Sequence, residues 1–182
     1  DQATVTVNEA TSGSVSLNQT IYSDERSDVA EIGISLTNTD TATITIGDKS
    51  DNNWVQNVTV EDGNDDDFVT LLFNTYTAGT SDDTYGGGTG YVVYSVADGA
   101  DAVTNIAPAS GSFDPDSPAA NTLADADYSI SAVAGNTAAE QTDDGEDAAA
   151  TLSLSQRSTD SVTNYVAPGT RLGDLDSASD VQ

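Results

Sequence analysis

Apolar and polar residues alternate more regularly between residues 29 and 76 than elsewhere in the chain. A first run places Ala30, Ile32, Ile34 and Leu36 in one phase, and a second run places Ala42, Ile44 and Ile46 in one phase, with threonines between them. A period of two is typical of a half-buried β-strand. Because only Asn38–Asp40 separates the two runs, the pattern predicts a β-hairpin.

Two further runs, residues 54–60 and 68–73, follow after polar stretches. The four runs together predict a four-stranded antiparallel meander. The last run differs from the others because its apolar residues occupy both phases: Val69, Leu71 and Phe73 in one, Phe68 and Leu72 in the other. A strand that is apolar on both faces is central in its sheet or covered on both sides.

Shorter runs of the same kind occur along the rest of the chain, at residues 5–7, 15–21, 91–96, 103–106, 128–132 and 152–154. Helical periodicity is almost absent. This pattern predicts an all-β fold, an antiparallel, Ig-like β-sandwich of eight to ten short strands joined by long acidic loops.

The sandwich is expected to span residues 1–157, with a long excursion at 97–127 that is rich in Ala, Asp and Pro. Prolines in that stretch exclude a long helix. Residues 158–182 are expected to be a strand-like tail or linker toward a further C-terminal part. Because the chain begins at Asp1 rather than Met, a processed N-terminus or a fragment is expected.

Composition changes this picture in one respect. The formal net charge is −27, with only four Lys and Arg residues, and such a charge alone predicts disorder. In about 1 M salt, however, the Debye length falls to about 3 Å, so neighbouring carboxylates repel one another weakly. The regular strand pattern together with this charge therefore predicts a protein of an extreme halophile that folds in brine.

Composition also excludes several classes of function. No basic patch exists that could neutralise the phosphates of a nucleic acid, and no apolar stretch approaches the roughly 20 residues that span a bilayer. The chain has no His and no Cys, which removes the usual groups that activate a nucleophile. We therefore expect a protein that is not an enzyme.

One acidic loop has the spacing of a cation site. Asp62, Asn64 and Asp66 occupy alternate positions, and hard cations such as calcium take several oxygen ligands from such spacing. The twelve-residue EF-hand pattern is incomplete, because Gly63 is misplaced and the final Glu is missing. The alternative is an acidic loop that only faces water.

Two sequons, Asn18-Gln-Thr20 and Asn57-Val-Thr59, are candidates for N-linked glycans. Both asparagines lie opposite the apolar phase of their strands, so both are expected to face solvent. Trp54 shares the phase of the neighbouring valines and is expected in the core. Interface candidates on loop or edge segments are Tyr85, Val162 and Tyr165.

Four stretches of the chain resemble a known family. Residues 34–47 (ISLTNTDTATITIG), 57–64 (NVTVEDGN), 69–76 (VTLLFNTY) and the ending at 168–181 are similar to haloarchaeal cell-surface glycoproteins, the S-layer-type surface proteins. The resemblance implies an exported, N-glycosylated, extracellular domain of the cell envelope that assembles with copies of itself. It brings no catalytic residues.

An alternative assembly uses the same fold. In a secreted filament or pilus, the 158–182 tail or the N-terminal strand would complete the sheet of a neighbouring subunit by β-strand addition.

Overall fold

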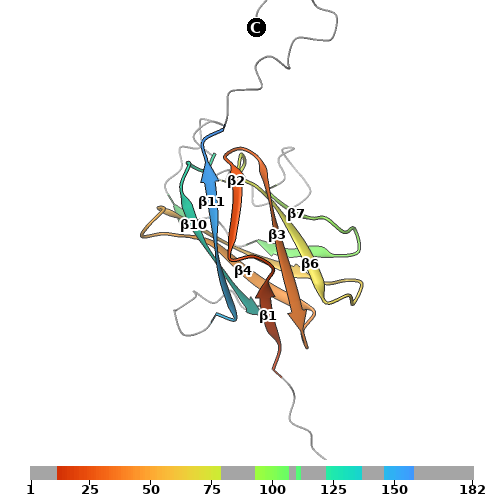
Figure 1. Ribbon diagram of the computed structural model, residues 1–182. Coiled ribbons are helices and arrows are strands. Elements are labelled where there is room, and N and C mark those ends of the chain that lie inside the picture. The colour runs from red at the N-terminus through yellow and green to blue at the C-terminus, as the bar shows by residue number, and fades with distance from the viewer. Residues whose placement is uncertain (1–11, 79–92, 107–109, 112–121, 137–145, 158–182) are drawn as a thin grey trace, which may run out of the picture.

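The computed structural model describes residues 12–78, 93–106, 110–111, 122–136 and 146–157, which form a two-sheet β-sandwich without a helix (Figure 1). The strands are β1 (Ser14–Leu17), β2 (Ile21–Glu25), β3 (Val29–Thr37), β4 (Thr41–Asp48), β5 (Trp54–Glu61), β6 (Phe68–Asn74), β7 (Tyr94–Val96), β8 (Ala102–Ile106), β9 (Ser110–Gly111), β10 (Asp127–Ala134) and β11 (Ala148–Ser155). Every regular element among the described residues is a strand, and the strands form two sheets, so the predicted all-β sandwich is confirmed.

The two sheets differ in size. One is four-stranded, in the order β1-β3-β6-β7, and the other is seven-stranded, in the order β2-β11-β10-β4-β5-β8 with β9 beside β5. The pairing of β2 with β11 is parallel, whereas the other strand pairs are antiparallel. The prediction of purely antiparallel sheets is therefore wrong at this one edge.

The expected single strand at residues 15–21 is in fact two strands that belong to different sheets. The chain leaves the four-stranded sheet after β1 and joins the seven-stranded sheet as β2, with a bend at residues 18–20 between them. The bend reverses the phase, so Tyr22 is buried while Ile21 is 59% exposed. The apolar–polar alternation in the sequence did not reveal the bend, because the three residues there, Asn18, Gln19 and Thr20, are all polar and are compatible with either phase.

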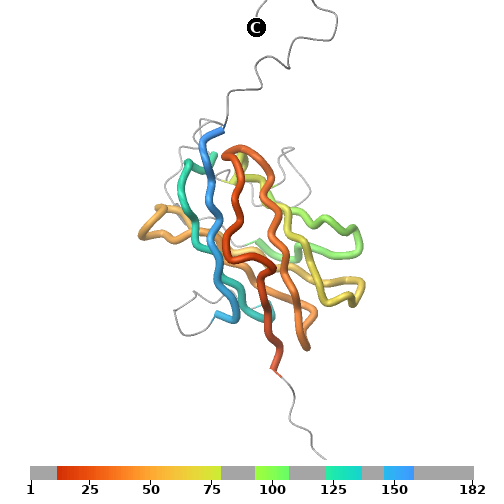
Figure 2. The backbone as a smooth tube through the Cα atoms, in the orientation of Figure 1, coloured from red at the N-terminus to blue at the C-terminus, as the bar shows by residue number. Residues whose placement is uncertain are grey.

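The predicted hairpin of residues 29–46, and the meander built on it, are wrong. β3 pairs with β1 and β6, whereas β4 pairs with β5 and β10, so the link at 38–40 passes from one sheet to the other (Figure 2). Only β4 and β5 form a hairpin within residues 29–76, from Thr41 opposite Glu61 to Asp48 opposite Trp54. Alternation indicates which side chains of a strand face the core. Strands of both sheets in a sandwich show the same alternation, so the pattern does not indicate to which sheet a strand belongs or which strand it pairs with.

The core is one cluster built from the inner faces of both sheets. Trp54 is 1% exposed, as predicted; its ring stacks on Phe73 at 6.0 Å and meets Tyr128 edge-on at 6.2 Å. Phe73 in turn stacks on Tyr94 at 4.9 Å. Val69, Leu71 and Phe73 are fully buried in β6, which lies between β3 and β7, so the prediction of a central strand is confirmed.

The outward faces of the two sheets are unlike. On the seven-stranded sheet Thr43, Thr45 and Thr59 are 1%, 9% and 2% exposed although they point away from the core. Their hydroxyl groups bond to one another or to neighbours: Thr43 Oγ1 lies 3.2 Å from Thr59 Oγ1 and donates to the Gly135 carbonyl at 2.9 Å. Buried hydroxyls need such partners.

Candidate glycosylation sites and acidic loop

Asn18 lies in the bend between β1 and β2, directly across from Gly33 of β3. Its backbone N–H donates to the Gly33 carbonyl at 3.0 Å, and its side-chain Oδ1 accepts from the Tyr22 hydroxyl at 2.8 Å. A Cβ added at Gly33 would overlap the Asn18 carboxamide, so the carboxamide lies flat on the glycine. Asn18 itself is exposed, and whether it is glycosylated stays a prediction.

Asn57 lies in the middle of β5, opposite Thr45 of β4, and the next residues of its sequon, Val58 and Thr59, pair with β4 on one side and β8 on the other. Its Oδ1 accepts from the Thr45 hydroxyl at 2.6 Å, and the residue is half-buried. The hydroxyl of its sequon partner Thr59 is enclosed with Thr43. The expected outward orientation is therefore present, but this part of the face is closed, and glycosylation of Asn57 stays a prediction.

The Asp62 loop uses its side chains to hold its own backbone. Asp62 is 6% exposed, and its two carboxylate oxygens accept three backbone N–H groups, from Asn64 at 3.2 Å, Asp65 at 3.0 Å and Asp67 at 2.8 Å. Asn64 Oδ1 accepts from the Asp66 N–H, and Asp66 Oδ1 accepts from the Phe68 N–H, both at 3.0 Å. The alternate spacing thus also suits a series of Asx turns.

Within the described parts of the chain, no group of three or more His, Cys, Asp or Glu side chains is placed to hold a metal ion. Calcium binding by Asp62, Asn64 and Asp66 stays a prediction. Carboxylates bonded to backbone N–H groups can still offer a second lone pair to a cation.

Asp101, on the turn before β8, joins this loop, although no sequence pattern predicts the contact. Its Oδ1 accepts from the Gly63 N–H at 3.4 Å, and a Cβ at Gly63 would overlap the Ala100 carbonyl oxygen, so the two turns are in close contact. Burial raises the pKa of Asp101, and the nearby carboxylates of Asp62, Asp98 and Asp66 raise it further. No local pattern links Gly63 to Asp101, which are 38 positions apart in the chain.

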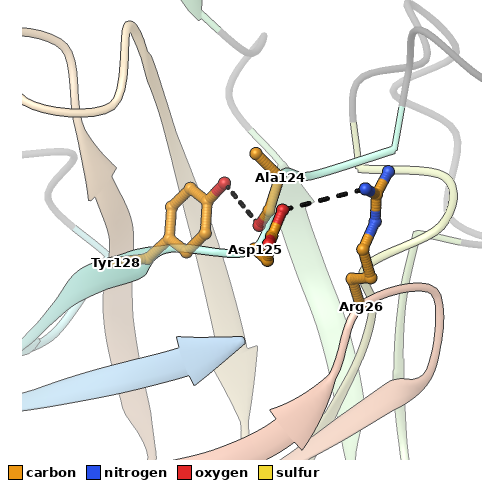
Figure 3. Close-up of polar contacts among 4 residues, drawn as sticks. All are labelled: Arg26, Ala124, Asp125 and Tyr128. Atoms are coloured by element: carbon orange, nitrogen blue, oxygen red, sulfur yellow. Dashed lines mark hydrogen bonds and ion pairs between the residues drawn. The ribbon is translucent and has the colours of Figure 1, made fainter. Parts of the chain in front are cut away.

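A single ion pair is found among the described residues, at one end of the sandwich. Arg26, in the turn between β2 and β3, lies 3.8 Å from Asp125, just before β10, and the Tyr128 hydroxyl beside them donates to the Ala124 carbonyl at 3.1 Å (Figure 3). Both charged side chains are partly exposed, so the pair contributes at most about 1 kcal/mol. Burial is the main cause that raises the pKa of Tyr128.

The predicted interface residues Tyr85, Val162 and Tyr165 lie outside the described residues, and so does the whole predicted tail at 158–182. No helix of membrane-spanning length and hydrophobicity occurs in the part of the chain that is described. Sequence reasoning missed the contacts of the candidate residue Asn18 with Tyr22 and Gly33. Gly33 could have been found, because a glycine inside a strand pattern often marks a close approach.

Comparison with known proteins identifies the relatives of this chain. The family described as "Domain of unknown function (DUF7827)" matches residues 7–135. A "Cell surface glycoprotein" of Haloferax gibbonsii is 36% identical over 165 residues, which is 91% of this chain and 16% of that protein. "Cell surface glycoprotein 1" of Haloarcula hispanica is 33% identical over 164 residues, 90% of this chain and 17% of that protein.

A third relative, "Cell surface glycoprotein 2" of Haloarcula hispanica, is 40% identical over 76 residues, 42% of this chain and 8% of that protein. No solved structure matches the chain. The chain therefore spans about a sixth of the length of the first two relatives. These relatives confirm the resemblance to haloarchaeal cell-surface glycoproteins and the extracellular location at the cell surface.

Proposed function

This chain belongs to the DUF7827 domain family, and from that premise we propose that it is a structural domain of an exported, surface-layer-type glycoprotein that assembles with copies of itself. In this role the domain acts through rigid packing and surface contacts in brine, and it performs no catalysis.

The observation that supports this proposal is that the sandwich closes within one chain. Both sheets are made from residues of this chain between β1 and β11, and their inner faces share one core. A domain of this kind covers its core with its own strands. It can therefore serve as a repeated rigid unit in an envelope whose contacts lie on its surface.

A filament joined by strand addition is the second candidate, and one edge favours it. β2 ends the seven-stranded sheet, its Ile21 is 59% exposed, and a groove of about 340 Å³ lies between β2 and β3 beside it. Edge strands are ready sites for pairing with another chain.

The test is electron cryo-tomography of haloarchaeal cells that carry the full-length protein, followed by averaging of the repeating unit. We expect a two-dimensional lattice in which each sandwich is complete in its own chain. Filaments in which a strand of one subunit lies along β2 of the next would reject the lattice and support the second candidate.

A further inference from the structure

The two sequons of this domain have opposite environments. Asn18, Gln19 and Thr20 are all exposed and lie in the bend between strands. In the other sequon, Thr59 is 2% exposed, its hydroxyl lies 3.2 Å from that of Thr43, and the segment is paired on both sides within the sheet. A sequon is defined by its amide nitrogen and its hydroxyl, so a transferase that acts on the folded domain must reach both.

The side-chain carboxamide of Asn18 is also held in one orientation against β3. Nδ2 is the atom of its carboxamide that lies nearest to the position of a Cβ on Gly33, closer than Cγ or Oδ1. Ile32 and Ile34 are buried in the core, so Gly33 between them faces outward; the Asn18 carboxamide therefore lies on the outward face of β3, and a glycan on Nδ2 starts on this face. Oδ1 is held by the Tyr22 hydroxyl at 2.8 Å, which fixes this orientation.

Beyond Gly33 the outward face of the sheet continues onto β6. Gly33 is paired with Thr70 of β6, about 4.8 Å further across the sheet. Phe68 and Leu72 point outward two residues to either side of Thr70, opposite Ser35 and Glu31. A sugar ring placed over Gly33 and Thr70 would therefore lie between an aromatic and an aliphatic side chain, with small side chains beneath it.

We propose that Asn18 and not Asn57 is the glycosylated residue of the folded domain, and that its glycan extends over the outward face of the four-stranded sheet. In the transfer, Asn18 Nδ2 forms a bond to the anomeric carbon of a lipid-phosphate-linked oligosaccharide. The bond from that carbon to the phosphate oxygen breaks, the lipid phosphate leaves with the electron pair, and a transferase base takes the Nδ2 proton. This inference rests on the proposed export of the protein.

Site selection is tested by mass spectrometry of glycopeptides from full-length protein isolated from the haloarchaeal envelope. We expect the Asn18 peptide to carry the glycan mass in most molecules and the Asn57 peptide to lack it. Gln19→Val is the matched control, because it gives the open sequon the same middle residue as the closed one. Asn18 should remain modified in Q19V, which attributes the difference to structure; an occupied Asn57 or an empty Asn18 would overturn the proposal.

The position of the glycan is tested by oxidative footprinting of the same protein. Phe68 is 37% exposed in the bare domain and Tyr76, beyond the end of β6, is 42% exposed. We expect oxidation of Phe68 to rise several-fold in Asn18→Gln relative to the glycosylated protein, while oxidation of Tyr76 stays the same. An equal rate at Phe68 in both proteins would refute the placement.

These outcomes separate the inference from the proposed function. A lattice whose subunits lack a glycan on Asn18 would remove the inference and leave the function. A glycan on Asn18 of a protein that forms no lattice would support the inference and remove the function.

Discussion

The four-stranded and seven-stranded sheets read alike in sequence, yet their outward faces differ in the structure. Outward residues of the four-stranded sheet, such as Glu31, Ser35, Phe68 and Thr70, are exposed or half-buried. The corresponding threonines of the seven-stranded sheet are buried and bonded to one another. The same alternation of Thr and Val or Ile therefore produces one outward face with exposed and half-buried side chains and one on which the threonines are buried.

The difference shows that polarity alone does not mark a free surface. A threonine can be buried at little cost when its hydroxyl has a partner, as Thr43 has at Thr59 and Gly135. Open surface is marked better by the bend at Asn18 and by a glycine under it than by the count of hydroxyl groups.

The largest expected effect is the loss of the whole fold, both sheets together, when salt is removed. Transfer from molar NaCl or KCl to dilute buffer should unfold the domain, because the net charge of −27 is then unscreened. Circular dichroism across this range of salt would record the loss of the β spectrum. A spectrum that does not change in dilute buffer would contradict the halophilic interpretation.

Next in size is a matched pair of charges, one on each outward face. Thr59→Asp should lower the free energy of unfolding by about 3 kcal/mol or more, because it buries an unpaired carboxylate. Thr70→Asp, on the half-buried face of β6, should cost less than about 1 kcal/mol. Denaturant unfolding in molar salt measures both values, and equal losses would show that the two outward faces tolerate a charge equally well.

Removal of calcium tests the acidic loop, which lies between the two sheets. If Asp62, Asn64 and Asp66 bind calcium, EGTA in molar salt should lower the Tm, because a ligand at 100 times its Kd adds about 2.7 kcal/mol. Asp62→Ala serves as the control for loss of the turn itself: it removes the acceptor of three backbone N–H groups, so its Tm should fall even without EGTA. An unchanged Tm with EGTA would remove the predicted site while leaving the turn intact.

A smaller contrast comes from two tyrosines of the inner faces. The Tyr94 hydroxyl is buried without a hydrogen-bond partner, whereas the Tyr22 hydroxyl bonds to Asn18 Oδ1. Tyr94→Phe should therefore raise the free energy of unfolding by about 1 kcal/mol, and Tyr22→Phe should lower it by about 0.5 to 1.5 kcal/mol. Thermal unfolding in molar salt measures both, and a loss of stability in Y94F would show that the Tyr94 hydroxyl is satisfied.

The smallest effect is a pH dependence at Asp101. Its pKa is raised in the folded state, so its ionised form opposes folding, and this penalty disappears as the pH falls through the raised pKa. Asp101→Asn should be more stable than wild type at pH 7 and equal to it below about pH 4. Asp48 is the opposite case, because bonds from Ser50 lower its pKa and its contribution is lost on acidification. Measurements of Tm against pH for Asp101→Asn and Asp48→Asn, each compared with wild type, check the two signs.

The sequence predicted what depends on local pattern. Residues of β10 and β11 face the core as their alternation indicated, with Tyr128, Ile130, Leu152 and Leu154 buried, and the short strand near residues 103–106 is present. The pairing of β3 with β6 and of β4 with β10 was not predictable, because each strand could have found several partners with the same period.

The candidate sites were also predictable only in their local features and not in their contacts with distant residues. The sequons and the Asp62 loop are visible in the sequence because they are local motifs. The contacts that distinguish them come from distant residues: Gly33 beneath Asn18, Thr43 beside Thr59, and Asp101 against Gly63. Those contacts depend on strand register, which alternation leaves undetermined.

The most direct measurement is an electron cryo-microscopy map of the full-length protein in its native envelope, at a resolution that shows individual sugars. We expect density that starts at Asn18 and continues over Gly33 and Thr70, with contacts between copies made on other surfaces. Density attached to Asn57, or a neighbouring subunit packed on the outward face of the four-stranded sheet, would contradict it.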